Sequence, residues 1–142
     1  MQFESKITET LTIKNNVREV KHFSDFMKSA IEKLDVDNSL ARQLRLAVEE
    51  AVVNVIDYAY PLDTEGDITI IMMFDGHTIR FQIIDAGVAF DPTAKHKTDT
   101  TLSVEERQIG GLGILLLREM MDSINYERTD GKNKLTLIRK IK

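Results

Sequence analysis

The sequence predicts an α+β fold in which helices pack on one face of a mixed, mostly antiparallel sheet. Two segments in the first half of the chain carry apolar residues at helical spacing. Two pairs of β-branched segments are each joined through an Asp-Gly dipeptide, which is a strong hairpin signal. Strands grouped in hairpins, with helices outside them, are typical of a two-layer sandwich.

The N-terminal elements are a strand and a helix. Residues 3–13 (FESKITETLTI) alternate apolar and polar side chains, which predicts a half-buried strand. Residues 15–34 are predicted to form an amphipathic helix. Its apolar positions are Val17, Val20, Met27, Ile31 and Leu34.

A second helix is predicted from Ser39 to Tyr58, ending before Pro61 because the residue before a proline is disfavoured in helical geometry. At about 100° per residue one face of this helix is continuously apolar and predicts core. This face consists of Leu40, Leu44, Ala47, Val48, Ala51, Val52 and Val55.

Two hairpins complete the sheet. Segments 68–74 and 78–84 are joined through Asp75-Gly76, and segments 123–129 and 134–141 flank DGKN. Between the hairpins, the polar segment 91–109 is longer than the usual limit of about 12 to 15 residues for a structureless connection. It contains an unrecognised short helix near 103–107 or forms a functional lid, and a mobile surface loop is the alternative.

The stretch RQIGGLGILLLREMMD (107–122) places glycines just ahead of an apolar helix. Glycine costs about 0.5 to 1 kcal/mol inside a helix relative to alanine, so a compensating role is expected. At a loop-to-helix junction, glycines let a ligand approach first-turn N–H groups that lack intrahelical partners. The pattern favours a phosphate site at Gly110, Gly111 and Gly113.

Composition indicates the class of protein. With 142 residues, we expect one domain spanning 1–142. The absence of cysteine excludes disulfides and thiolate metal sites, and it suits a cytoplasmic location. A net charge of −4 argues against general nucleic-acid affinity. No apolar run approaches the roughly 18 residues needed to span a bilayer, so no membrane partner is expected.

Familiar nucleotide and metal motifs are absent. The chain has no GxxxxGK[ST] P-loop, GGLGILL lacks the third glycine of a dinucleotide fingerprint, and no HRD or DFG kinase signature occurs. The three histidines have no metal-ligand spacing and are expected on the surface or in loops. They are His22, His77 and His96.

The second helix carries the pair Glu50 and Asn54 at i and i+4, near the edge of its apolar face, whereas Glu49 falls on the solvent side. An acid and an amide placed this way could serve a metal and a nucleophile. An exposed pair without a function is the alternative. In IIDAGVAFDP (83–92), a predicted strand ends at Asp85 and Gly87 follows, which reads either as an ordinary turn or as a place for a flat ligand.

Taken in order, EAVVN (50–54), DAGVAFDP (85–92) and GGLG (110–113) resemble the GHKL ATP-binding fold. Within it the chain is most similar to the small anti-sigma-factor serine kinases of bacterial partner-switching systems. The resemblance covers roughly residues 5–141. Ala89 stands where the family's DxGxG box has its second glycine.

The resemblance implies ATP and Mg²⁺ as cofactors. It implies that Asn54 coordinates Mg²⁺, that Glu50 orients or deprotonates the attacking hydroxyl, and that Asp85 accepts from the adenine amino group. Gly87 lets the backbone lie against the base.

The resemblance also assigns phosphate contacts to the amides of Gly110, Gly111, Leu112 and Gly113, under an ATP lid at about 91–109. Thr136 resembles the family threonine that contacts adenine through water, and Arg107 resembles a lid cation that reaches the terminal phosphate.

The resemblance implies an ATP-dependent protein serine/threonine kinase that phosphorylates an anti-anti-sigma factor, sequesters a sigma factor and forms a homodimer. An ATP-gated binding module without phosphotransfer needs the same pocket and is the main alternative. A structural α+β protein with accidental motifs would bind no Mg-ATP.

Overall fold

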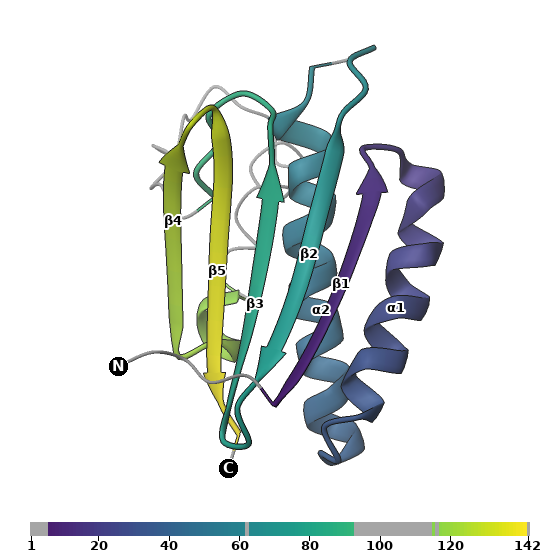
Figure 1. Cartoon of the computed structure of the whole chain (residues 1–142), viewed down its shortest axis with the longest axis vertical. Helices are drawn as coiled ribbons and strands as arrows, with labels where there is room; N and C mark the ends of the chain where they lie inside the picture. Colours follow the sequence, from purple (N-terminus) through teal and green to yellow (C-terminus); the bar gives the residue numbers. More distant parts are fainter. Residues whose placement is uncertain (1–5, 62, 93–114, 116, 142) are drawn as a thin grey trace.

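The protein is a two-layer α+β sandwich in the computed structural model, which describes residues 6–61, 63–92, 115 and 117–141. Figure 1 shows the sheet as one layer and the helices as the other. The elements are β1 (Ile7–Lys14), α1 (Val20–Glu32), α2 (Asn38–Asn54), β2 (Asp67–Phe74), β3 (Thr78–Asp85), β4 (Ser123–Thr129) and β5 (Lys132–Lys140). A 3₁₀ turn (Val17–Glu19) precedes α1, and a π-helix (Val55–Ala59) follows α2.

The sheet confirms the predicted hairpins and corrects one detail. Its strand order is β1-β2-β3-β5-β4. Every pairing among the described strands is antiparallel, so the expected parallel component is absent from this part of the chain. The second hairpin turns at Asp130 and Gly131, both with positive φ, and Lys132 and Asn133 of the DGKN motif already belong to β5.

The helices form where the periodicity predicts them. An Asp37 carboxylate caps α2 by accepting from the Leu40 N–H at 2.8 Å. The predicted apolar face of α2 is buried except for Leu40, which is half-buried. In the first helix Val17 is 70% exposed, contrary to the prediction, because it lies in the 3₁₀ turn before α1. Phe23, absent from the predicted stripe, is buried instead.

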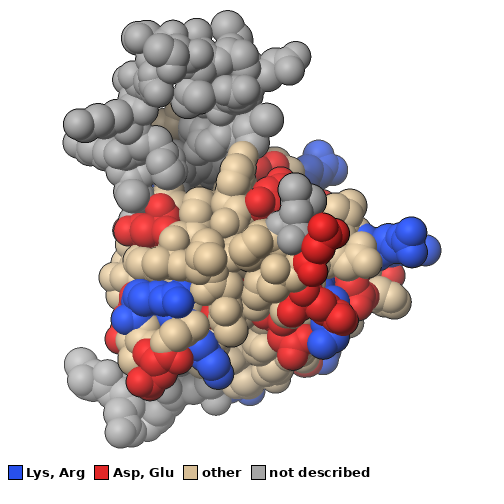
Figure 2. Space-filling view, turned by 90° about the horizontal axis from the view of Figure 1, so that it is seen from above, with Lys and Arg blue, Asp and Glu red and all other residues tan. Residues whose placement is uncertain are grey.

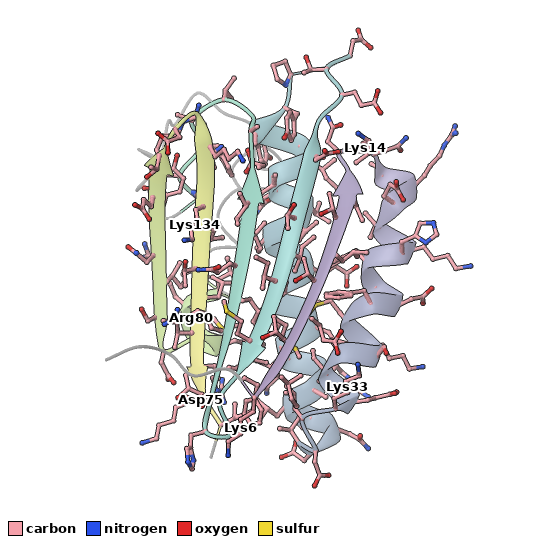
Figure 3. All side chains as sticks on the ribbon, in the orientation of Figure 1. Lys6, Lys14, Lys33, Asp75, Arg80 and Lys134 are labelled. Carbon is pink, nitrogen blue, oxygen red and sulfur yellow. The ribbon has the colours of Figure 1, made fainter. Side chains whose placement is uncertain are left out.

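The core lies between the helices and one face of the sheet. Alternate residues of β2, β3 and β5 point toward the helices and are almost fully buried. Of the predicted glycine-led helix, residues 117–120 are described as helical, and Leu117 enters the core. Arg80 and Lys134 lie on the opposite face, away from the helices (Figure 3). No helix in the described part of the chain is long and apolar enough to cross a membrane.

The core contribution of α2 can be measured at Leu44. Leu44→Ala should destabilise the protein by about 2 to 5 kcal/mol, because truncating a fully buried leucine loses transfer energy and leaves a cavity. Leu46→Ala is the matched control on the same helix, since Leu46 is 46% exposed. Urea unfolding measures both free energies, and equal losses in the two variants would contradict this packing.

Candidate functional site

The carboxylate of Asp85, at the end of β3, is a buried polar group held by two hydrogen bonds. It is 3% exposed. Its Oδ1 accepts from the Gly87 N–H at 2.9 Å and from Asn133 Nδ2 at 2.8 Å. Among the described residues, none donates a hydrogen bond to Oδ2. One carboxylate oxygen is therefore held by the protein, and the other can accept from a ligand.

Gly87 lies against the end of the π-helix. The next residue, Val88, donates its N–H to the Ala59 carbonyl at 2.7 Å. A Cβ on residue 87 would lie 2.2 Å from that same oxygen, a distance that backbone atoms cannot accept. Close approach to helix backbone therefore explains this glycine, in addition to the ligand approach that the sequence suggests. Arg128 Nη1 donates to the Gly87 carbonyl at 2.8 Å from strand β4.

Tyr60 holds the other side of the same turn. Its hydroxyl accepts from the Ala86 N–H at 2.9 Å and donates to the Asp67 carbonyl at 2.7 Å. Burial is the main cause that raises the pKa of Tyr60. The ring fits because residue 66 is glycine: a Cβ there would lie 2.2 Å from Tyr60 Cε1.

Asn54 and Glu50 approach the site from α2. Asn54 is the last residue of the helix and is 7% exposed, and its amide makes no hydrogen bond with any other described residue. This amide is therefore available to a ligand. Glu50 lies one turn earlier and is half-buried. Glu49 is also half-buried, so the expected contrast in exposure between the two glutamates is not found.

The structure places Asn54 of α2 and Asp85 of β3 at the same end of the molecule. The C-terminal end of α2 lies beside the end of β3 (Figure 1), linked by the Val88–Ala59 hydrogen bond. The rings of Tyr58 and Phe90 add a stacked contact with centroids 5.5 Å apart. A π-helix directly after Asn54 is consistent with a functional position, since π-helical turns occur frequently at such sites.

Asn133, on β5, belongs to the site although the sequence reasoning missed it. It pairs in register with Asp85, and its alternation with Leu135 and Leu137 places it on the helix-covered face. Thr136 pairs with Gln82 and lies on the other face, so the structure does not bring it to Asp85. Counting residues back from the turn at Asp130-Gly131 could have shown this parity.

The predicted phosphate-binding part lies outside the described residues, so it stays a prediction. This part comprises the 93–109 portion of the lid and Arg107, Gly110, Gly111, Leu112 and Gly113. His22 and His77 are exposed, as expected, whereas His96 also lies outside the description. No cluster of three or more His, Cys, Asp or Glu side chains occurs in the described portion.

The donor set at Asn54 nevertheless fits Mg²⁺ bound to a nucleotide. Mg²⁺ commonly takes one or two protein oxygen ligands and completes its shell with phosphates and water. A single buried amide oxygen with Glu50 one turn away matches that requirement, whereas it would not suit an all-protein cage.

Two clefts lined by described residues flank the Asp85 turn. One, of about 690 Å³, borders Asp85, Gly87 and Arg128, and the other, of about 1020 Å³, borders Tyr58 and Pro61. Neither cleft is lined by Glu50 or Asn54. The candidate site is therefore defined by the polar groups that can bond to a ligand, and not by the size of a cleft. Figure 2 shows this end of the molecule, with uncharged residues in the middle of the face and Asp and Glu toward its edge.

Comparison with known proteins agrees with this geometry. Residues 13–139 match the family model described as a histidine kinase-like ATPase domain. In the crystal structure of the RsbU and RsbW domains of Rv1364c from Mycobacterium tuberculosis, 32% of that chain superimposes on 95% of this one, with a TM-score of 0.68 and 14% identity. At that identity the likeness shows the fold.

Curated relatives include three named regulators. The chain is 32% identical over 94 residues to serine/threonine-protein kinase BtrW of Bordetella bronchiseptica, covering 66% of each chain. It is 29% identical over 92 residues to serine-protein kinase RsbW of Listeria monocytogenes, covering 62% of this chain and 59% of the relative. Anti-sigma F factor of Thermoanaerobacter pseudethanolicus is 31% identical over 99 residues, covering 70% of this chain and 67% of the relative.

The contact at Gly87 can be tested by adding one methyl group. Gly87→Ala should destabilise the protein by about 1 to 3 kcal/mol, because the new Cβ displaces the turn from the Ala59 carbonyl. Val88→Ala, at a half-exposed neighbour, should change stability by less than about 0.5 kcal/mol. Denaturant midpoints measure both, and an unperturbed Gly87→Ala variant would rule out this close approach.

The hydroxyl of Tyr60 can be removed while its ring is kept. Tyr60→Phe leaves the Ala86 N–H and the Asp67 carbonyl without their partner, so a loss of about 1 to 3 kcal/mol is expected. Tyr58→Phe is the matched control, since the structure describes no hydrogen bond from the Tyr58 hydroxyl to a described residue. Thermal unfolding of the two variants should therefore differ; matching midpoints would refute the bridging role of Tyr60.

Proposed function

The chain belongs to the histidine kinase-like ATPase domain family, and on that premise we propose that it is an ATP-dependent protein serine/threonine kinase of the anti-sigma-factor type. One observation carries the proposal: the Asn54 amide, which has no hydrogen-bond partner among the described residues, lies at the same end of the fold as a buried carboxylate with one oxygen to spare, Asp85. A magnesium nucleotide needs both kinds of group.

Asp85 and Asn54 bind different parts of the nucleotide. Asp85 accepts from the exocyclic amino group of adenine through Oδ2, while Gly87 and Tyr60 keep the turn in place behind it. Asn54 would hold Mg²⁺ through its amide oxygen, and the bound ion would neutralise charge on the phosphates. The glycine-led segment 110–113 and Arg107 complete the phosphate half in this proposal.

Glu50 acts as the base of the transfer step. A serine or threonine hydroxyl of the protein substrate gives its proton to the Glu50 carboxylate as its oxygen bonds to the γ-phosphorus. The bond from that phosphorus to the bridging oxygen breaks, and ADP leaves. A positioned base contributes typically about 10² to 10⁴ in rate.

The names of the relatives supply the partner classes. Relatives are named serine-protein kinase and anti-sigma F factor, which supports an anti-anti-sigma factor as the phosphorylation substrate and a sigma factor as the sequestered partner. A cytoplasmic homodimer completes the proposal, as the resemblance to the small anti-sigma kinases implies.

The function is tested by equilibrium binding and by transfer. The protein should bind ATP in the presence of Mg²⁺ and lose that binding with EDTA. Incubation with radiolabelled ATP and a candidate anti-anti-sigma factor should then yield phosphoserine or phosphothreonine. Binding without transfer would favour the ATP-gated module, and the absence of any binding would reject both.

The role of Glu50 separates binding from chemistry. Glu50→Gln should retain Mg-ATP affinity within about threefold and lose transfer by about 10² to 10⁴, because the amide cannot accept the proton. Glu49→Gln is the matched control, identical in chemistry and adjacent in sequence, and should keep transfer. Full transfer by the Glu50 variant would reject Glu50 as the base.

A further inference from the structure

The side-chain amide of Asn133 uses its whole hydrogen-bonding capacity inside the protein. Nδ2 donates to Asp85 Oδ1 at 2.8 Å and to the Val88 carbonyl at 2.7 Å. Oδ1 accepts from the Phe90 N–H at 3.2 Å and from the Tyr126 hydroxyl. An asparagine amide has two donor hydrogens and two acceptor lone pairs, and all four are occupied.

These partners also determine which way the amide faces. Two acceptors, a carboxylate and a carbonyl, lie on one side, and two donors, an N–H and a hydroxyl, lie on the other. Turning the amide over would set like groups against each other at the contacts with Asp85, Val88 and Phe90, while the Tyr126 hydroxyl could accept instead of donate. Because Asn133 is 4% exposed, water cannot readily replace the lost partners.

We propose that Asn133 is a positioning residue that determines base specificity by orienting the Asp85 carboxylate, without touching the nucleotide itself. The inference rests on the proposed function and deepens it. With Gly87 N–H and Asn133 Nδ2 both on Oδ1, rotation of the carboxylate is blocked, and Oδ2 is kept in one place. The bonds from Asn133 to the Val88 carbonyl and the Phe90 N–H fix the chain beyond the turn relative to that carboxylate.

Such an acceptor discriminates between purine bases. Adenine presents an amino group that can donate to a carboxylate oxygen, whereas hypoxanthine carries a carbonyl at that position and would meet it as a second acceptor. Hydrogen bonds to charged groups contribute about 1.5 to 3 kcal/mol, which corresponds to about 10- to 150-fold in affinity. The protein should therefore bind Mg-ATP more tightly than Mg-ITP by roughly that factor.

The experiment compares the ATP:ITP affinity ratio in matched variants. Asn133→Asp keeps the shape but replaces the donor nitrogen with an acceptor facing Asp85, so the ratio should fall at least about tenfold. Asn125→Asp makes the same chemical change at an exposed position on β4 and should leave the ratio unchanged. Calorimetric titration gives both affinities, and circular dichroism establishes that each variant is folded.

A second variant tests the same inference even if Asn133→Asp does not fold. Tyr126→Phe removes only the hydroxyl that donates to Asn133 Oδ1, and the ratio should fall at least about threefold. A purely structural role for Asn133 would weaken both nucleotides equally and leave the ratio intact, which would overturn the inference. So would a native protein that binds ATP and ITP alike.

The outcomes separate this inference from the proposed function. If the native protein binds no Mg-ATP, the proposed function fails and the inference fails with it. If the native protein binds and selects ATP while folded Asn133→Asp keeps the native ratio, the inference alone fails.

Discussion

The hydrogen bond from the Val88 N–H to the Ala59 carbonyl is the contact on which the site depends. It joins the end of β3 to the end of the helical segment that carries Asn54, two elements that are remote in sequence. The bond is possible because residue 87 has no Cβ to collide with the same carbonyl. Together with the bond from the Ala86 N–H to the Tyr60 hydroxyl, it fixes the turn after Asp85 relative to the end of the helical segment.

Local chemistry made much of the fold predictable. The apolar stripe of α2 and the two Asp-Gly hairpins are short-range patterns, and the structure confirms them. The failures arise where a pattern continues past an element's real boundary. Val17 fits the helical period, but it lies in a 3₁₀ turn and faces solvent. Periodicity also could not reveal the π-helix after Asn54, because that turn depends on tertiary contacts such as the one at Ala59.

The site residues likewise differ in whether the sequence alone could predict them. Asp85, Glu50 and Asn54 belong to contiguous motifs and could be singled out from the sequence. Asn133 could not, because its importance comes from strand register and from bonds to residues more than forty positions away. Thr136 shows the converse: a family position transferred without its register falls on the wrong face of the sheet for contact with Asp85.

The two halves of the described site contrast in how their polar groups are satisfied. Around Asp85, the turn's amides and the Asn133 side chain are bonded within the protein, so this half is stable before any ligand arrives. The side-chain amide of Asn54 instead makes no hydrogen bond to another described residue, so it is open to a ligand. In the proposed function a nucleotide would place its base at Asp85 and its phosphates at Asn54, so its affinity would depend on both halves of the site.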